Sequence, residues 1–146
     1  KKSQTRYTAG GADISPPLRW ENVPDSTMSY AIIVEDPDSP SGTWTHWIIY
    51  DIPGTKIHLK EGIKPQTKLA DGSIQAMNSF HKIGYGGPSP PPGSSHRYFF
   101  KIYALDCLSN AIPSFCPPEK DMQKFKSYLN QHAKAQAELM GIYERR

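Results

Sequence analysis

The sequence has few cysteines, no long apolar run and little net charge, and each shortage argues against a class of protein. Two cysteines in 146 residues are fewer than a small secreted fold held by several disulfides would carry. No apolar run approaches the roughly 20 residues that cross a bilayer, so membrane insertion is not expected. The net charge of +3 lacks the dense basic stripe of a nucleic-acid-binding protein, so no nucleic-acid partner is expected.

The two cysteines, Cys107 and Cys116, lie on either side of Pro113. They are either core thiols or one local disulfide, and their small number favours thiols. The first ten residues contain no hydrophobic signal segment, which predicts a soluble, cytoplasmic protein. Because the sequence does not begin with Met, a leader could have been removed, and a periplasmic location stays open.

What the sequence does have is 14 prolines, about twice the usual share of about 5 %, together with 11 glycines. Proline interrupts helices and central strands alike, so a loop-rich, mainly β protein is expected rather than a helical bundle. No internal repeat or low-complexity linker divides the chain. We therefore expect residues 1–146 to form a single domain.

Three apolar segments predict the centre of a β-sheet: Ser29–Glu35, Thr43–Ile52 and Arg97–Leu105. In the second segment both faces are bulky, and alternation places Trp44 and His46 on one face with Ile48 and Tyr50. Residues 53–80 are weakly patterned, and we expect loops with short strands there.

One helix is predicted near the C-terminus. Pro117 and Pro118 can open it, and apolar residues then recur at three- and four-residue steps through Phe125 and Leu129. The pattern predicts a helix that runs to about Glu138, before Gly141, and covers the sheet as a lid.

The first segment with chemistry is 36–46, where Asp36 ends one predicted strand and His46 lies near the start of the next. If these strands are antiparallel neighbours, the carboxylate and the imidazole meet at the same rim of the sheet. The alternative is an Asp-Pro turn with a structurally satisfied histidine behind it.

The second segment is 84–98, a stiff glycine- and proline-rich loop that leads to His96 at the start of a strand. His96 and Tyr98 are two residues apart and point the same way. Taken alone, the segment could be a simple connector. Two separate segments that each place a histidine at a strand end favour a shared pocket.

Two imidazoles and a tyrosine hydroxyl can donate hydrogen bonds to a phosphate or carboxylate, and Asp36 and Asp38 can orient the histidines. A metal is the rival ligand, because two histidines and a carboxylate can hold iron or zinc. Hydrolysis by a Ser-His-Asp triad is a weaker alternative, since no serine lies in a Gly-x-Ser-x-Gly turn. His58, His81 and His132 show no partner pattern and are assigned surface or boundary roles.

These segments resemble the signatures of the phosphatidylethanolamine-binding protein family, also called Raf kinase inhibitor proteins, and most closely its compact bacterial and archaeal branch. The first match is Asp36-Pro37-Asp38-x-Pro40 followed by Trp44 and His46, and the second is Gly93-x-x-His96-Arg97-Tyr98. Supporting matches are Asp13-Ile14-Ser15-Pro16-Pro17-Leu18-x-Trp20 and Gly84-Tyr85-Gly86-Gly87-Pro88.

The resemblance implies a central antiparallel β-sheet packed on a smaller sheet, with a C-terminal helix and short peripheral helices. It implies a non-catalytic binding protein, without a cofactor, whose pocket takes a small phosphate- or carboxylate-bearing ligand such as a phospholipid headgroup. It also leaves open a homodimer. The ligand-binding residues it implies are Asp36, Asp38, Trp44, His46, Gly86, Gly87, Pro88, His96 and Tyr98. Arg97 points to the opposite face from His96 and is expected in a structural ion pair behind the pocket.

Two other functions remain as hypotheses. A kinase or protease inhibitor could act through the pre-stiffened loop Ser89–Ser95. However, the loop Ser39–Thr43 is shorter than in animal relatives, so kinase inhibition cannot be carried over. The third hypothesis is a metal-dependent enzyme that uses the histidines and Asp36.

Overall fold

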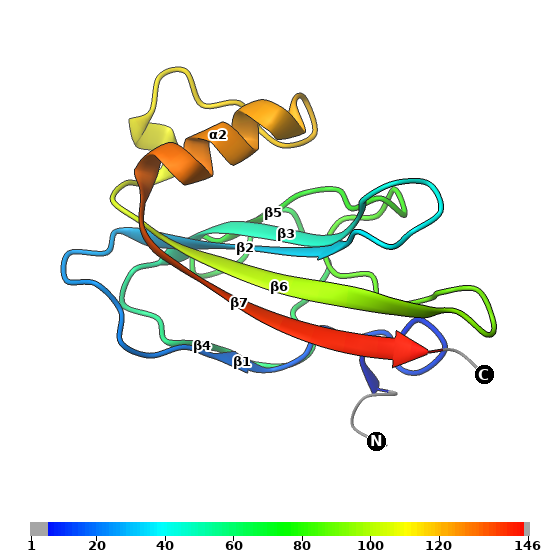
Figure 1. Cartoon of the computed structure of the whole chain (residues 1–146). Helices are drawn as coiled ribbons and strands as arrows, with labels where there is room; N and C mark the ends of the chain where they lie inside the picture. Colours follow the sequence, from blue (N-terminus) through cyan, green and yellow to red (C-terminus); the bar gives the residue numbers. More distant parts are fainter. Residues whose placement is uncertain (1–5, 145–146) are drawn as a thin grey trace.

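The computed structural model describes residues 6–144, which form three layers. A five-stranded antiparallel sheet lies in the middle, helix α2 (Met122–His132) covers one face, and a two-stranded sheet covers the other (Figure 1). The prediction of a mainly β fold with two packed antiparallel sheets is confirmed. No helix in this part of the chain is long and apolar enough to cross a membrane.

The five-stranded sheet has the order β5-β3-β2-β6-β7. Its strands are β2 (Ser29–Asp36), β3 (Trp44–Pro53), β5 (Ile74–Gln75), β6 (Ser95–Leu105) and β7 (Ala133–Glu144). The small sheet pairs β1 (Leu18–Arg19) with β4 (His58–Leu59), and a short 3-10 helix, η1, covers Ser109–Ala111. The three predicted central strands are adjacent to one another, as β3, β2 and β6.

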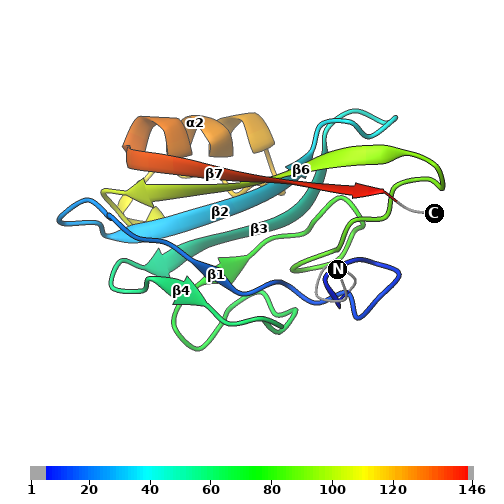
Figure 2. The same ribbon diagram turned by 60° about the horizontal axis from the view of Figure 1, so that its bottom comes forward.

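The two faces of β2 explain its uninterrupted apolar sequence, because every residue of this strand is buried. Ala31 and Ile33 pack toward α2, against Phe125 and Leu129. Tyr30, Ile32 and Val34 pack on the other face, toward the small sheet and the N-terminal segment, which Figure 2 brings forward. The central strand is therefore covered on both sides.

Strand β3 does not alternate as predicted. Trp47 lies opposite Val34, but the next pair is Thr45 opposite Glu35, so His46 is an extra residue without a partner on β2. Such a bulge turns the side chains before it relative to those after it. The prediction that Trp44 and His46 share a face with Ile48 and Tyr50 is therefore wrong, since Ile48 and Tyr50 pack toward α2 whereas His46 contacts Tyr98 on the other side.

The predicted helix is correct in its packing face and wrong at both ends. It begins after Asp121, whose side chain accepts a hydrogen bond from the Lys124 backbone N–H at 3.1 Å, rather than at the two prolines. It ends at His132 rather than near Glu138, because the chain turns extended at Ala133 and pairs along the whole of β6 as β7. Residues 133–138 favour a helix locally, but pairing with β6 satisfies their backbone instead.

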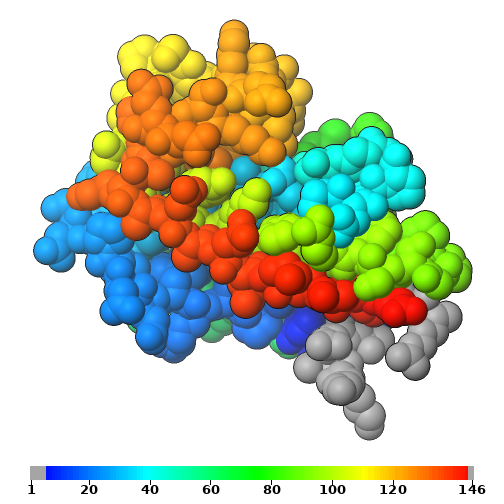
Figure 3. Space-filling view, viewed as in Figure 1, coloured from blue at the N-terminus to red at the C-terminus, as the bar shows by residue number. Residues whose placement is uncertain are grey.

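Strand β7 is the edge of the sheet and is exposed along most of its length. Figure 3 shows it crossing the surface between α2 and the N-terminal segment. Cys107 and Cys116 are both free, so the predicted thiols are confirmed.

Candidate functional site

The predicted site residues meet because three neighbouring strands end or begin at the same rim of the sheet. Strand β2 ends at Asp36, β3 begins at Trp44, and β6 begins at Ser95, with β2 antiparallel to both neighbours. In Figure 1 this rim is the end of the sheet where the loop between β2 and β3 projects. The prediction that Asp36 and His46 share a rim is confirmed.

Asp36 and His96 form the first contact of the site. Nδ1 of His96 donates to Oδ2 of Asp36 at 2.6 Å, and both side chains are buried. The other carboxylate oxygen, Oδ1, accepts the backbone N–H of Asp38 at 2.8 Å. The carboxylate is thus held from two sides, and it fixes the ring of His96 with Nε2 as the remaining nitrogen.

Asp38 makes the matching contact one residue further along β6. Its carboxylate accepts hydrogen bonds from the backbone N–H, Nε and Nη2 of Arg97, all between 2.8 and 2.9 Å. These bonds to Arg97 hold the pKa of Asp38 well below its usual range. The two aspartates of the first motif therefore bind two consecutive residues of the second motif, and Arg97 forms the predicted ion pair.

His46 is held by a different loop. Its Nδ1 donates to the carbonyl oxygen of Gly86 at 2.7 Å, and its ring packs edge-on against Phe80 and Tyr98 at centroid distances of 5.3 Å. Burial lowers the pKa of His46 from its usual value near 6.5, and the hydrogen bond to Gly86 only partly offsets this. In the neutral form with Nδ1 protonated, Nε2 is an acceptor, and it becomes a donor only when the ring is charged.

A cavity of about 230 Å³ opens between these side chains. Five predicted residues line it, and the loops on either side complete the wall. The lining comprises Asp36, Ser39, Pro40, Ser41, Trp44, His46, Phe80, Ser89, Pro90, Pro91, His96 and Tyr98. The volume is below the range of about 300–1,000 Å³ common for drug-sized ligands, so the cavity suits a small group.

Two hydrogen-bond donors in this lining have no partner among the described residues: the hydroxyl of Tyr98 and the indole N–H of Trp44. Burial and the nearby charge of Asp36 raise the pKa of Tyr98, so the hydroxyl keeps its proton. Buried donors without acceptors are costly, and an acceptor brought by a ligand would satisfy them.

The remaining predicted residues lie behind the cavity or beside it. Asp38 faces Arg97, and Gly86 supports His46 from behind. The backbone N–H of Gly87 donates to Asp13, and Pro88 lines a neighbouring cavity instead. The prediction missed Phe80, which lies in the weakly patterned stretch and packs on both Trp44 and His46. Nothing in its local sequence distinguishes it.

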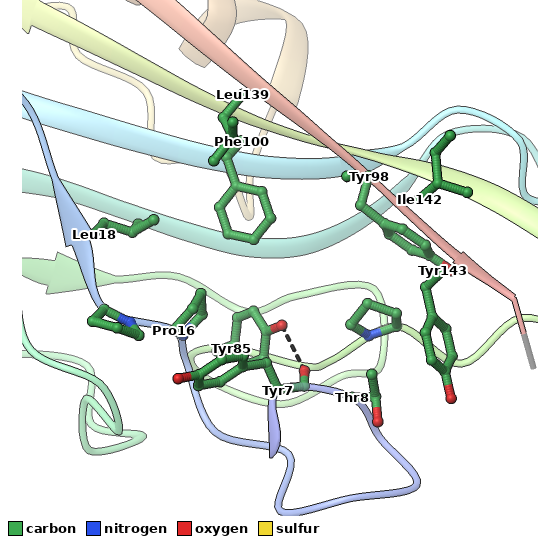
Figure 4. A pocket seen from close by; sticks show the side chains of 13 residues that line it. Tyr7, Thr8, Pro16, Leu18, Tyr85, Tyr98, Phe100, Leu139, Ile142 and Tyr143 are labelled. Atoms are coloured by element: carbon green, nitrogen blue, oxygen red, sulfur yellow. Dashed lines mark hydrogen bonds between the residues drawn. The ribbon is translucent and has the colours of Figure 1, made fainter. Parts of the chain in front are cut away.

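The neighbouring cavity is apolar and measures about 270 Å³ (Figure 4). Tyr98 lies between the two cavities and lines both. Leu18, Phe100 and Leu139 supply apolar wall, and Tyr85 is fixed at the far side by a hydrogen bond from its hydroxyl to the carbonyl oxygen of Tyr7 at 2.7 Å. No charged side chain lines this cavity, so the ionisable groups gather only on the side of Asp36 and the two histidines.

The sheets and the covering helix place the chain among mainly β proteins with two packed antiparallel sheets. Within that class, the chain belongs to the phosphatidylethanolamine-binding protein family, whose family model matches residues 2–144. It is 43 % identical over 140 residues to a UPF0098 protein of Aquifex aeolicus, covering 95 % of this chain and 79 % of that protein. It is 41 % identical over 141 residues to a UPF0098 protein of Methanothermobacter thermautotrophicus, covering 97 % and 89 %.

A solved structure supports the same assignment. Escherichia coli YbcL, described as a member of the mammalian PEBP family, superposes with a TM-score of 0.81 at 34 % identity, covering 97 % of this chain and 90 % of that one. Relatives in bacteria and archaea agree with the predicted branch of the family. Family membership and fold support a role as a binding protein.

Proposed function

We propose that this protein binds a small phosphate- or carboxylate-bearing ligand, such as a phospholipid headgroup, in the cavity between Asp36, His46, His96 and Tyr98. The observation that carries the proposal is that two buried histidines from different strands have their Nδ1 atoms already bound, to Asp36 and to Gly86. Each ring then has only Nε2 free for a ligand.

The charge state of the rings decides how an anion binds. When His46 or His96 is protonated, Nε2 donates, and a charge-assisted hydrogen bond to a phosphate oxygen forms. The hydroxyl of Tyr98 and the indole N–H of Trp44 are additional donors without partners among the described residues. The anion in turn stabilises the imidazolium, so affinity rises as pH falls through the histidine range.

The apolar cavity on the other side of Tyr98 supports a ligand that carries a hydrocarbon part as well as a headgroup. Phospholipids combine both parts, whereas inorganic phosphate supplies only the anionic group of the headgroup. We therefore expect a short-chain phosphatidylethanolamine to bind more tightly than free phosphoethanolamine, and phosphoethanolamine to report the headgroup contribution alone.

Calorimetric titration with phosphoethanolamine and with inorganic phosphate, at about pH 5.5 and about pH 7.5, tests the proposal. We expect tighter binding at the lower pH. His96→Ala should weaken binding roughly ten- to hundredfold, as expected for the loss of a hydrogen bond to a charged group worth about 1.5–3 kcal/mol. The control is His58→Ala, because His58 is exposed in the small sheet and does not line the cavity. No binding at either pH, or equal binding by wild type and His96→Ala, would overturn the proposal.

The alternatives remain less supported predictions. The loop Ser89–Ser95 contributes Ser89, Pro90 and Pro91 to the cavity wall, so it is part of the same site, and no contact favours enzyme inhibition through it. For the metal hypothesis, Asp36, His46 and His96 do not form one of the sets of three ligand atoms within 4.8 Å of one another in residues 6–144.

A further inference from the structure

A second cluster of polar side chains lies at the opposite end of the sheet. Strand β6 ends at Leu105, and the next two residues, Asp106 and Cys107, lie beside His132, the last residue of α2. Figure 1 shows this junction, where α2 turns into β7, at the far end of β6 from the candidate anion site. One ligand atom from each of the three residues lies within 4.8 Å of the other two.

The cluster is built from rigid elements. The backbone N–H of Asp106 donates to the carbonyl oxygen of His132 at 3.1 Å, which ties the loop to the helix end. The side chain of His132 donates from Nδ1 to Oδ1 of Asp106 at 3.0 Å. The carbonyl oxygen of Cys107 accepts the hydroxyl of Ser29 at 2.6 Å, which fixes the backbone that carries the thiol.

A fourth side chain, Tyr128, packs its ring in the core beside the cluster but leaves its hydroxyl unsatisfied within residues 6–144. Tyr128, one turn before His132, is 5 % exposed, and its hydroxyl has no hydrogen-bond partner of good geometry among the described residues. This hydroxyl lies beside the sulfur of Cys107, and the Tyr128 ring packs against the ring of His132 at a centroid distance of 5.5 Å. A thiolate sulfur accepts hydrogen bonds more strongly than a neutral thiol, so a zinc-bound Cys107 would accept a hydrogen bond from the Tyr128 hydroxyl, which keeps its proton.

We propose that Asp106, Cys107 and His132 form a zinc-binding site. Thiolate, imidazole and carboxylate are the three side chains that Zn²⁺ prefers, and three protein ligands with one water complete a tetrahedral site. Tetrahedral bonds of about 2.0–2.3 Å require ligand atoms roughly 3.3–3.6 Å apart. The 3.0 Å between Nδ1 of His132 and Oδ1 of Asp106 is already close to this value, and the sulfur, at most 4.8 Å from either ligand atom, must approach by about 1.5 Å at most. Binding converts the Cys107 thiol to a zinc-bound thiolate and releases its proton to water, and the proton on Nδ1 of His132 moves through water to Nε2, so that Nδ1 can bind zinc.

Zinc suits this set better than the harder alternatives. Mg²⁺ and Ca²⁺ require several oxygen ligands, and the cluster offers a single carboxylate. The alternative explanation is a structural contact between His132 and Asp106 at the helix end, with no metal bound and no role for the Cys107 thiol. The two explanations differ in one observable, which is whether the sulfur binds the metal.

Titration of the full chain with Co²⁺, after removal of metals with a chelator and then of the chelator, tests this directly. A thiolate–cobalt charge-transfer band in the near ultraviolet should saturate at one equivalent and disappear when Zn²⁺ is added. Cys107→Ser should abolish the band, and His132→Ala should weaken Co²⁺ binding more than about tenfold. Cys116→Ser is the matched control and should leave the band intact. A missing band, a band that survives Cys107→Ser, or a band lost in Cys116→Ser would overturn the proposal.

An alkylation experiment on the wild type avoids any variant that fails to fold. Iodoacetamide is added with and without Zn²⁺, and the modified peptides are identified by mass. We expect zinc to protect Cys107 at least about tenfold more than Cys116, because only a coordinated thiolate is shielded. Equal alkylation of Cys107 with and without zinc would contradict the proposal.

Discussion

At the scale of single residues, Gly86 shows why the glycine-rich segment has this sequence. A Cβ atom built on Gly86 would lie 2.5 Å from the ring of Phe80, closer than real Cβ contacts allow. The same Phe80 ring packs on His46, whose Nδ1 donates to the Gly86 carbonyl. The missing side chain therefore allows loop, ring and histidine to pack together.

Gly86→Ala should consequently lower stability by about 1–3 kcal/mol, the usual cost of overpacking, and weaken phosphate binding by displacing His46. Urea unfolding measures the first effect and calorimetry the second. Gly141→Ala is the control, because its Cβ would meet no atom within 4 Å. If both variants are equally stable, Phe80 can move freely and the packing argument fails.

The lowered pKa of His46 predicts how stability depends on pH. Its pKa is depressed mainly by burial, so below about pH 6.5 the unfolded chain binds a proton more readily than the folded chain. The contribution of His46 to stability should therefore be intact above about pH 6.5 and decline as the pH falls below it. Urea unfolding between about pH 5 and 8 measures this decline.

Phosphate should reverse part of that decline, because a bound anion favours the protonated ring. His46→Gln removes the titrating group and should flatten the pH dependence over the same range. If His46→Gln shows the wild-type slope, another group causes the acid sensitivity, and the depressed pKa of His46 is not responsible.

At the scale of elements, the start of α2 depends on Asp121. Its carboxylate accepts the N–H of Lys124, and its own carbonyl accepts the N–H of Phe125. Asp121→Ala should lower stability by about 1 kcal/mol, measured by urea unfolding. Glu119→Ala, before the helix, should change it by less than about 0.5 kcal/mol. If both variants lose the same free energy of unfolding, the hydrogen bond from Lys124 to Asp121 adds nothing beyond the effect of removing a negative charge near the start of the helix.

The contrast between α2 and the central strands shows what the sequence can predict. Strands β2 and β3 are predictable because burial on both faces leaves a dense apolar sequence, and β6 is predictable from its aromatic and β-branched residues although it is only partly buried. The end of α2 is not, because residues 133–138 favour a helix locally, and only the free edge of β6, formed by a distant segment, makes them a strand. Local preference and long-range pairing conflict here, and pairing prevails.

The candidate site divides in the same way. Asp36, His46, His96 and Tyr98 are predictable, because each is a polar residue at the end of an apolar strand. The bulge at His46 is not, since it depends on the register between β2 and β3. The positions of Phe80 and of the cluster at His132 depend on segments that meet only in the folded chain. His132, which the sequence analysis assigned a surface or boundary role, is therefore proposed as a zinc ligand only from the structure.

At the scale of the whole molecule, β6 connects the two proposed sites. His96 is near its start and Asp106 follows its end, ten residues apart, which is about 33 Å at about 3.3 Å per strand residue. The strand lies between β2 and β7; it is paired with β7 along its whole length and with β2 from Phe99 to Leu105. Sites this far apart on one strand share no contact, so their binding energies should add.

We therefore expect His96→Ala to leave Co²⁺ affinity at Cys107 unchanged within about twofold, and Cys107→Ser to leave phosphoethanolamine affinity unchanged by the same margin. Saturating zinc should raise the melting temperature of wild type and His96→Ala equally, because ligand binding to the folded state stabilises each by the same mass action. Calorimetry and thermal unfolding of the two single variants and the double variant measure the coupling. A coupling above about 0.5 kcal/mol would show that β6 transmits a change from one end of the sheet to the other, and the two sites would then have to be treated as one linked system.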